Sequence, residues 1–427
     1  MTTEQLYQLY LQYPSIQTDT RKLKEGDIFF ALSGPNFNGN NFAKKAVESG
    51  AAYAIVDEEV ANNDSRIIQV DNVLDSLQLL AKFHRQQFDI PFIAITGSNG
   101  KTTTKELVST VLASHFKTYT TQGNLNNHIG IPLTLLHVKN DAEMAVIEMG
   151  ANHLKEIESY CEYTNPTHGI ITNCGKAHLE GFGSIEGVRK GKGELFDYLR
   201  AHNGTAFIYN DYEYLHEMSS GIENTITYGT ANAYVTGNAI VSEDYLKVKI
   251  LYKEKPLLIQ TKLVGDYNLP NVLCAVATGM YFEIPIEKII TAIESYTPGN
   301  SRSQMIVKGS NHIILDAYNA NPSSMKVAIE NIAKLKAGEK VLMLGGMMEL
   351  GEDSLQEHQN IIDLINKHSW QQVVLVGGDF EKINHPFLYF NDSAAASEWC
   401  KQQNFKDVYF LIKGSRSVQM EKILAVL

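Results

Sequence analysis

The sequence lacks several features that would place it in other protein classes. It has four cysteines in 427 residues, with no C-x-x-C pair, so neither a disulfide framework nor a zinc knuckle is predicted. No apolar run reaches the roughly 18 residues that a membrane helix needs. The first residues, MTTEQLYQLYLQYPS, lack the basic flank and apolar core of a signal peptide. A cytoplasmic protein without membrane insertion is expected.

Positive charge is also scarce. Lysine and arginine number 37 against 48 aspartate and glutamate residues, a net charge of −11. Nucleic acids are normally bound by a basic face, so no nucleic-acid partner is expected, whereas anionic small molecules could still bind at locally basic sites. With 44% apolar and 20% charged residues, the chain has the composition of an ordered protein of two or three domains.

Apolar runs rich in β-formers alternate with longer helical patterns, which is typical of α/β proteins with parallel sheets. A helical pattern ends at Pro298 and Gly299, and a fresh strand begins after RQQFDIP. We therefore predict three α/β domains, over residues 1–89, 90–298 and 299–427. The strands predicted in the second and third domains cover residues 92–96, 145–149, 169–174, 312–318, 340–346, 373–378 and 408–414.

The stretch IAITGSNGKTTTKE has the residue types of a phosphate-binding loop. A strand that passes through such a loop into a helix surrounds an anion with backbone N–H groups at the positive end of the helix dipole. Gly97 and Gly100 allow the turn, Lys101 can reach the β- and γ-phosphates, and Thr102 can ligate Mg²⁺. Ile95 replaces the first glycine of the usual pattern, so an ordinary glycine turn is the alternative.

Oxygen and nitrogen ligands are predicted at other strand ends. Glu148 ends an apolar strand, at the edge where open α/β folds bind ligands, and a carboxylate suits Mg²⁺. His178 follows the next strand. A surface glutamate and a structural histidine are the alternatives. Asn124, Asn126 and Asn127 could bind sugar or diphosphate oxygens, or simply form turns.

Six motifs resemble those of the Mur ligases in their order and approximate spacing: ITGSNGKTTTKE, GNLNNHIGIPLTLL, IEMGANHLKEI, AHLEGFGS, DAYNANPSSM and IKGSRSVQMEKI. DAYNANPSSM resembles the members that join D-alanyl-D-alanine to UDP-N-acetylmuramoyl-tripeptide in peptidoglycan precursor synthesis. The resemblance implies an amino-terminal UDP-binding domain, a central P-loop ATPase domain and a Rossmann-like carboxyl-terminal domain that binds the dipeptide. It also implies ATP-dependent amide formation through an acyl phosphate, by an enzyme that acts as a monomer.

The resemblance implies ATP and two Mg²⁺ ions as cofactors, and a lysine carbamylated by CO₂ as a metal ligand. The residues implied in nucleotide binding are Gly97, Ser98, Asn99, Gly100, Lys101, Thr102, Thr103, Asn268, Asn271, Arg302, Asp316 and Asn319. The catalytic residues implied are Lys101, His178, Lys192 and Arg302, and the metal ligands are Thr102, Glu148, His178 and carbamylated Lys192. The substrate-binding residues expected are Thr20, Arg21, Asn124, Asn126, Asn127, Lys413, Ser415 and Arg416, of which the last three are available for the dipeptide carboxylate.

Two other interpretations stay open. Another amide ligase of the same architecture, such as a folylpolyglutamate synthase, should lack the TDTRK segment and DAYNANPSSM. A regulatory P-loop module would hydrolyse ATP without an amine acceptor. A solvated lysine on a basic helix is the alternative for Lys192, and no motif marks the third residue of the accepted peptide as diaminopimelate or lysine.

Overall fold

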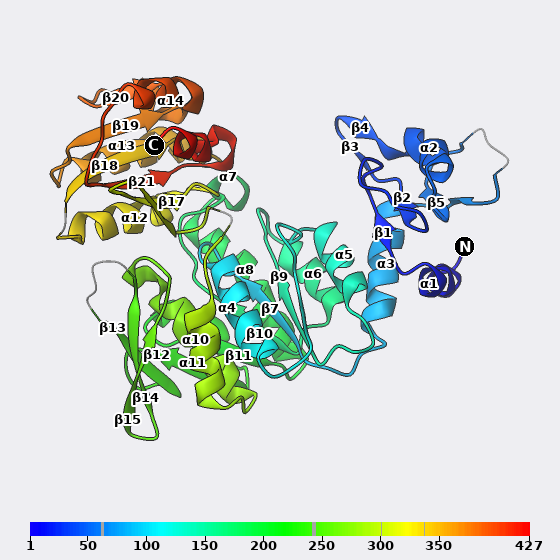
Figure 1. The fold of residues 1–427 in the computed structure, drawn as a ribbon. Helices are drawn as coiled ribbons and strands as arrows, with labels where there is room; N and C mark the ends of the chain where they lie inside the picture. The colour runs from blue at the N-terminus through cyan, green and yellow to red at the C-terminus, as the bar shows by residue number, and fades with distance from the viewer. Residues whose placement is uncertain (61–63, 241–244, 300, 337) are drawn as a thin grey trace.

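The chain folds around three successive β-sheets flanked by helices (Figure 1). The structure is a computed structural model that describes residues 1–60, 64–240, 245–299, 301–336 and 338–427. The predicted α/β class is confirmed, and all seven predicted strands are present within a few residues of the expected bounds. The predicted boundaries near residues 89 and 298 fall between consecutive sheets, and we refer to the three parts as the amino-terminal, central and third domains.

The amino-terminal domain contains a four-stranded parallel sheet in the order β1-β2-β5-β6 and a separate two-stranded hairpin, β3-β4. Helix α3 connects this domain to the central one and packs against α1 on one side and α5 and α6 on the other. The elements are α1 (Thr3–Gln12), β1 (Ile16–Gln17), β2 (Ile28–Phe30), β3 (Ser33–Gly34), β4 (Phe37–Asn38), α2 (Ala43–Glu48), β5 (Tyr53–Val56), β6 (Ile67–Gln69) and α3 (Val73–Arg85).

The central domain contains a nine-stranded sheet in the order β15-β14-β13-β12-β11-β10-β7-β9-β8. Every side chain of β7 and β9 is buried, because α4 packs on one face of these strands and α5 and α8 pack on the other, while α10 and α11 pack beside α4. Its strands are β7 (Phe92–Thr96), β8 (Thr118–Thr120), β9 (Met144–Glu148), β10 (His168–Ile171), β11 (Thr205–Tyr209), β12 (Asn224–Gly229), β13 (Val235–Ile240), β14 (Lys247–Tyr252) and β15 (Lys255–Gln260). Its helices are α4 (Lys101–Ala113), α5 (Gly130–His137), α6 (Glu156–Thr164), α7 (Leu179–Phe182), α8 (Ile185–Ala201), α9 (Glu213–Ser219), α10 (Leu269–Tyr281) and α11 (Ile286–Ser295).

Strands β14 and β15 extend the central sheet in the antiparallel direction and were not predicted. Buried and exposed side chains alternate along β14, so this strand has no continuous apolar run. The predicted strands are apolar runs buried on both faces, and this hairpin has no such run. Strand β11, which is buried on both faces, was not predicted either.

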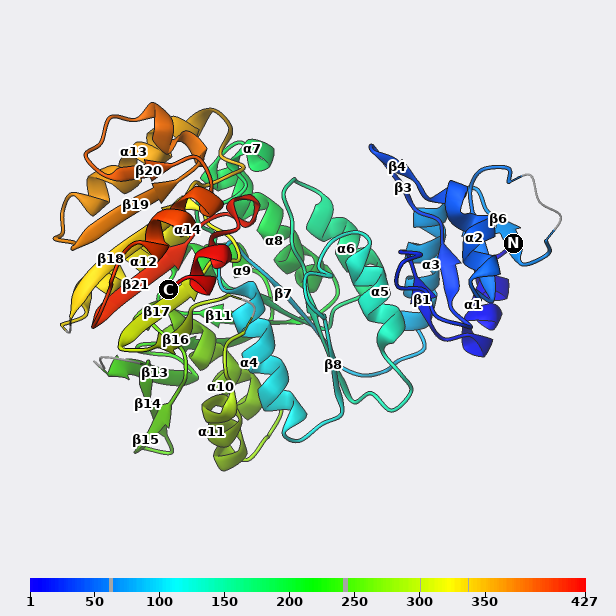
Figure 2. The ribbon, with the colours of Figure 1, turned by 45° about the horizontal axis from the view of Figure 1, so that its top comes forward.

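The third domain has a six-stranded sheet in the order β16-β17-β21-β18-β19-β20, parallel except for β16. Figure 2 shows α13 of this domain beside α7 of the central domain. The elements are β16 (Gln304–Lys308), β17 (Asn311–Asp316), α12 (Pro322–Lys334), β18 (Glu339–Gly345), α13 (Ser354–Ile365), β19 (Gln372–Val376), β20 (Leu388–Phe390), α14 (Ser393–Lys401) and β21 (Val408–Lys413).

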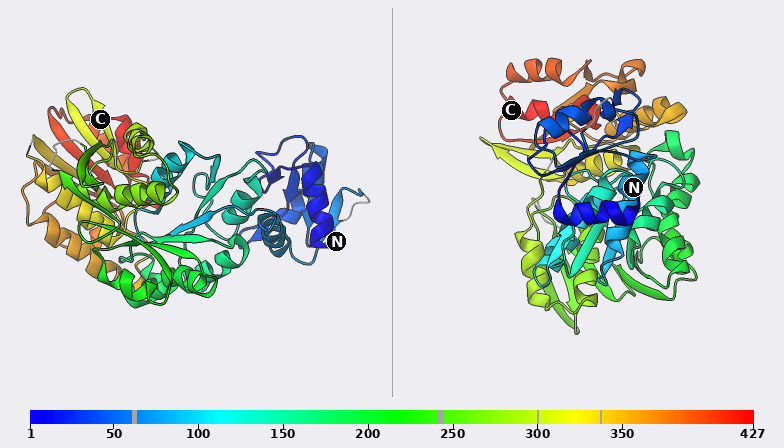
Figure 3. Two further views of the ribbon diagram at one scale, coloured as in Figure 1. Left: turned by 90° about the horizontal axis from the view of Figure 1, so that it is seen from below. Right: turned by 90° about the vertical axis from the view of Figure 1, so that its right-hand side faces the viewer.

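The molecule is elongated, with the amino-terminal domain at one end and the third domain at the other (Figure 3). Over the described ranges, no helix combines the length and apolar character needed to cross a bilayer.

A buried arginine holds α3 on the central domain. Arg85 donates to the carbonyls of Thr164 and Asn165, both at 2.9 Å, and to that of Phe88 at 2.8 Å. Its guanidinium carbon lies 3.7 Å from the centre of the Phe92 ring. Two of these carbonyls close the carboxyl end of α6, where the helix dipole favours a cation. Burial lowers the pKa of Arg85 to about 10, which leaves it charged at neutral pH.

Replacing Arg85 with alanine should destabilise the junction between the amino-terminal and central domains. Three carbonyls would lose a charged donor, which should reduce the free energy of unfolding by roughly 3 kcal/mol. Urea denaturation should show this as a lower midpoint, with the first transition affected most. Arg66→Ala is the matched control, because Arg66 pairs with Asp64 at the surface. Equal midpoints for the parent and Arg85→Ala would contradict the anchoring role.

Candidate functional site

A cleft of about 650 Å³ lies between the central and third domains. The loops that follow β7, β9, β10 and β17, and the end of β21, reach this cleft, so strand ends from two sheets meet there. Open α/β sheets bind ligands at these edges. The residues predicted from sequence that line it are Ser98, Asn99, Gly100, Lys101, Thr102, Thr103, Asn126, Asn127, Glu148, His178, Asn268, Asn271, Arg302, Asp316, Asn319 and Lys413.

The loop between β7 and α4 has the backbone of an anion-binding turn. Gly97 has φ +143°, and a Cβ there would lie 2.0 Å from the Thr172 hydroxyl oxygen, so no larger residue fits. Gly100, at φ +78°, precedes α4 without a side-chain cap, which leaves the first N–H groups of the helix available for a ligand. Lys101 Nζ curls over the loop and donates to the Gly97 carbonyl at 2.6 Å.

Glu148 and Thr102 form a buried pair at the base of this loop. The Thr102 hydroxyl donates to the two carboxylate oxygens at 3.0 and 2.9 Å, and Asn126 Nδ2 donates to one of them at 2.8 Å. Hydroxyl and carboxylate oxygens are donors that Mg²⁺ prefers, so this pair fits a magnesium ion that also contacts phosphate. Across the described residues, no group of three or more His, Cys, Asp or Glu side chains could hold a metal by itself.

Lys192 comes from α8 and is buried behind the cleft, with a residue exposure of 1%. Its ammonium donates to the Ala151 carbonyl at 2.8 Å and lies 5.1 Å from the centre of the Phe182 ring. Burial, followed by the charge of Lys101, lowers the pKa of Lys192 to about 7. An unmodified ammonium does not fit as a metal ligand, whereas the neutral amine that this pKa permits can react with CO₂.

His178 lines the cleft and contacts the third domain. Its Nδ1 donates to the carboxylate of Glu349, and this hydrogen bond lowers the pKa of Glu349. The expected role of His178 as a metal ligand would have to use its other ring nitrogen.

Two asparagines after β15 form one side of the cleft. Asn271 Nδ2 donates to Asn268 Oδ1 at 2.8 Å, and its own oxygen accepts from the Thr104 hydroxyl at 3.0 Å. The neighbouring Tyr267 hydroxyl donates to Ser303 Oγ at 2.9 Å, and burial raises the pKa of Tyr267. These contacts hold the asparagines rigidly beside the amino end of α4.

The third domain contributes charged side chains to the opposite wall. The Arg302 guanidinium carbon lies 3.5 Å from the centre of the Tyr318 ring. Lys413, which is buried, pairs with Asp316 at 2.6 Å and donates to the Asn319 carbonyl at 3.2 Å. Lys413 is therefore engaged within its own domain and is not free for a substrate carboxylate in this arrangement.

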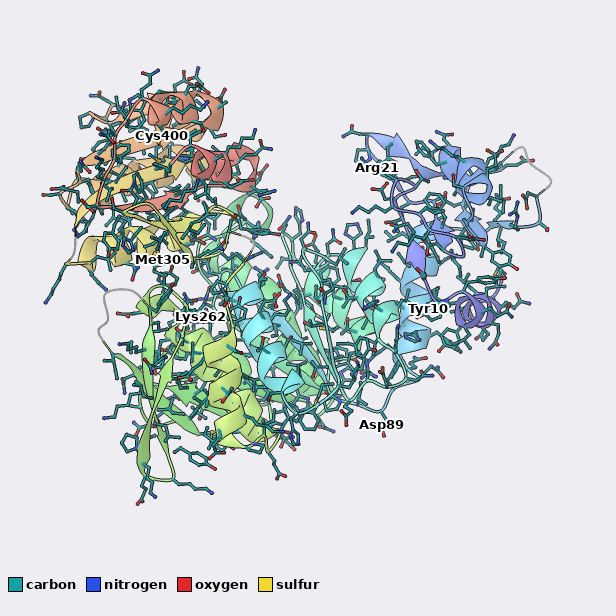
Figure 4. The ribbon with its side chains drawn as sticks, viewed as in Figure 1. Tyr10, Arg21, Asp89, Lys262, Met305 and Cys400 are labelled. Atoms are coloured by element: carbon teal, nitrogen blue, oxygen red, sulfur yellow. The ribbon has the colours of Figure 1, made fainter. Side chains whose placement is uncertain are left out.

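Other residues predicted from sequence do not line the cleft. The Arg21 side chain is 87% exposed and pairs with Asp19; it lies on the side of the amino-terminal domain that faces the third domain (Figure 4). Arg416 pairs with Glu421 at 2.8 Å, and the buried Ser415 hydroxyl accepts from the Met348 N–H at 3.0 Å. The residues in this group are Gly97, Lys192, Asn124, Thr20, Arg21, Ser415 and Arg416.

Sequence reasoning missed polar residues that join the two domains. Asn321 Nδ2 donates to Asn99 Oδ1 at 2.8 Å, and Asn173 Oδ1 accepts from the Asn99 N–H at 3.0 Å. Glu349, the partner of His178, was also missed. Asn321 lies within DAYNANPSSM and Glu349 within LGGMMELGEDS, so position after a strand was an available signal for both.

Comparison with known proteins covers nearly the whole chain. Three family models match it: "Mur ligase family, catalytic domain" over residues 12–85, "Mur ligase middle domain" over 95–279, and "Mur ligase, glutamate ligase domain" over 301–416.

Individual relatives agree with these matches. The chain is 33% identical over 426 residues to the UDP-N-acetylmuramoyl-tripeptide--D-alanyl-D-alanine ligase of Bacillus subtilis, covering 96% of this chain and 92% of that protein. A crystal structure of MurF from Acinetobacter baumannii superposes with a TM-score of 0.90 at 28% identity, over 99% of this chain and 98% of that one. The structure of MurF ligase from Thermotoga maritima in complex with ADP superposes with a TM-score of 0.88 at 25% identity, over 97% of both chains. The chain belongs to the Mur ligase family.

Proposed function

We propose that the chain is the ATP-dependent ligase that joins D-alanyl-D-alanine to UDP-N-acetylmuramoyl-tripeptide in peptidoglycan synthesis. The observation that carries this proposal is the buried Thr102–Glu148 pair next to Lys101, at a glycine loop that opens toward the third domain. The relatives named above have this activity in their names, and one was solved with ADP.

In the first step, a carboxylate oxygen of the tripeptide attacks the γ-phosphorus of ATP. The bond to the β,γ-bridging oxygen breaks, and ADP and an acyl phosphate form. Two anions must be brought together, so positioning and charge neutralisation supply most of the catalysis. Lys101 can swing from the loop carbonyls to the phosphates, and the free N–H groups of α4 hold the same oxygens. Thr102 and Glu148 would hold Mg²⁺, which would neutralise phosphate charge.

In the second step, the amine of the dipeptide attacks the acyl carbon. The amine loses a proton, the tetrahedral intermediate collapses, and phosphate leaves. Arg302, stacked on Tyr318 at the entrance to the third domain, is placed to stabilise negative charge on the departing phosphate. Asn268 and Asn271 are proposed to contact the nucleotide, and Asp316 and Asn319 to meet it from the third domain.

We propose that Lys192 carries a carbamate. The neutral amine nitrogen bonds to the carbon of CO₂ and releases a proton, and the product has anionic oxygens that can ligate a second Mg²⁺ near His178. The pKa of about 7 supports this, because a lysine of ordinary pKa would hold almost no neutral amine at neutral pH.

The other predicted substrate contacts come from the sequence motifs. Thr20 and Arg21 are proposed to bind the uridine diphosphate part of the UDP-linked substrate. Asn124, Asn126 and Asn127 are proposed to bind its sugar or diphosphate oxygens. Lys413, Ser415 and Arg416 stay predicted contacts for the dipeptide carboxylate and would require rearrangement of the ion pairs seen here. The cytoplasmic location and the monomeric state stay predictions.

A phosphate-release assay tests the proposed function. Release should require ATP, a UDP-N-acetylmuramoyl-tripeptide and D-alanyl-D-alanine together, and peptides ending in diaminopimelate and in lysine should both be tried. Lys101→Ala and Glu148→Ala should each lower kcat by at least about 100-fold, because each removes charge compensation at the reacting phosphate.

Lys117→Ala is the matched control, since Lys117 is an exposed lysine of the same domain and should keep parental activity. Release without the dipeptide would favour a regulatory ATPase, and turnover with glutamate and a folate would favour a folylpolyglutamate synthase. Full activity of Glu148→Ala would contradict the magnesium site.

The carbamate can be observed directly on the protein without nucleotide. With ¹³C-labelled CO₂, a carbamate carbon signal should appear and grow between pH 6 and 8. With a folded-state pKa of about 7, the neutral fraction of Lys192 rises from about one tenth to about nine tenths over that range. Lys192→Ala should abolish the signal, and its lost activity should return in part with short-chain carboxylic acids. Lys190→Ala, an exposed neighbour, should keep the signal. A signal that persists in Lys192→Ala would contradict the assignment.

A further inference from the structure

The loop between β10 and α8 touches the third domain at several points. Its Lys176 N–H donates to Ser323 Oγ at 3.0 Å, and Lys176 Nζ pairs at 2.6 Å with Glu357, which is buried. Two residues farther along, His178 donates to the Glu349 carboxylate. The Glu180 N–H donates to the Glu349 carbonyl at 3.3 Å. The segment that carries His178 is thus held from the third domain by both the backbone and the side chain of one residue, Glu349.

Both members of the His178–Glu349 pair have an unusual backbone. His178 has φ +52° and Glu349 has φ +63°, in the left-handed region that non-glycine residues seldom adopt. Each such residue costs about 1 kcal/mol or more and persists where surrounding contacts fix it. The contacts of Glu349 are of that kind, since they join the two strained residues directly.

The hydrogen bond determines which nitrogen of His178 is available. With Nδ1–H donating to a carboxylate, the neutral ring keeps its lone pair on Nε2. Within the described part of the chain, Nε2 has no hydrogen-bond partner, and His178 lines the cleft. A carboxylate behind a histidine commonly sets the orientation and basicity of the ring for a ligand on the other nitrogen.

We propose that Glu349 is a positioning residue, which accepts the Nδ1 proton of His178 and presents Nε2 to the cleft only while the third domain is seated on the central domain. The domain that brings the incoming amine would thereby complete the acyl-phosphate site. The kinetic part of this inference rests on the proposed ligase function; the structural part does not.

The tautomer of His178 tests the structural part. Protein labelled with ¹⁵N-histidine, at pH 8 and without ligands, should show His178 protonated on Nδ1, with its signals assigned by their loss in His178→Asn. Glu349→Ala should shift His178 toward the Nε2-protonated form. Glu349→Gln, which keeps an acceptor oxygen, should retain the parental form at least in part. A parental tautomer in folded Glu349→Ala would overturn the proposal.

Kinetics separate positioning from simple domain attachment. Glu349→Ala should lower kcat about tenfold or more while KM for ATP changes less than about threefold, and Glu349→Gln should recover part of the loss. Lys176→Gln is the matched control: it removes the ion pair with Glu357 but leaves His178 and Glu349 in contact, and Glu357 keeps its bond from Asn360. Its kcat should stay within about threefold of the parent.

An equal kcat loss in Lys176→Gln and Glu349→Ala would show that Glu349 only attaches the domains, and would overturn the proposal. Thermal unfolding of each variant identifies any loss of kcat that comes from misfolding. If Glu349→Ala is misfolded, the kcat and the His178 tautomer of Glu349→Gln test the proposal in its place. If the parent itself shows no ligase activity, the proposed function fails, and the tautomer of His178 still decides whether Glu349 orients the ring.

Discussion

Two lysines, the half-buried Lys101 in the cleft and the buried Lys192 behind it, set the electrostatic character of the site. Lys101 and Lys192 are close enough for the charge of Lys101 to lower the pKa of Lys192, and burial lowers the pKa of both. Like charges that lose their water are unfavourable unless anions accompany them. Glu148 supplies one negative charge, and the free amino end of α4 attracts more. A site with this balance favours a polyphosphate, and a second anion in the form of a carbamate would relieve the remaining repulsion.

The sheets explain how these charges come together. Lys101 begins the helix after β7, Glu148 ends β9, and His178 follows β10, three strands that are neighbours in one parallel sheet. Their carboxyl ends must share an edge, so groups distant in sequence become close without any special loop. The sheet of the third domain presents its own carboxyl edge to that of the central sheet, with Asp316 at the end of β17 and Lys413 at the end of β21. A cleft between two such edges is lined by groups from both domains, so one ligand can contact both.

This geometry also explains what could be predicted from the sequence. The predicted strands were those with apolar runs buried on both faces. Several residues that end or follow them, such as Ser98, Glu148 and His178, line the cleft, whereas Gly97 and Arg416 do not. Side-chain partners were not predictable, because they join distant parts of the chain: Asn321 and Asn99 are 222 residues apart, and Glu349 and His178 are 171 apart. The near-neutral pKa of Lys192 depends on its burial by α8 packing, which no local pattern contains. Arg416 was predicted from its place after a strand of the third domain, and its ion pair with Glu421 became visible only in three dimensions.

The two junctions between domains differ in chemistry, and the difference suits a ligase. On one side, α3 is held by Arg85, whose three bonds to carbonyls are shielded from water, so that separation would expose a charge and its acceptors together. On the other side, the polar contacts of the third domain are single hydrogen bonds and ion pairs, such as Asn321 with Asn99 and Lys176 with Glu357. Water can replace contacts of that kind at a net cost of about 1 kcal/mol each. We therefore expect the third domain to separate from the central domain more readily than the amino-terminal helices do, which would let the cleft exchange products for substrates without disturbing the P-loop sheet.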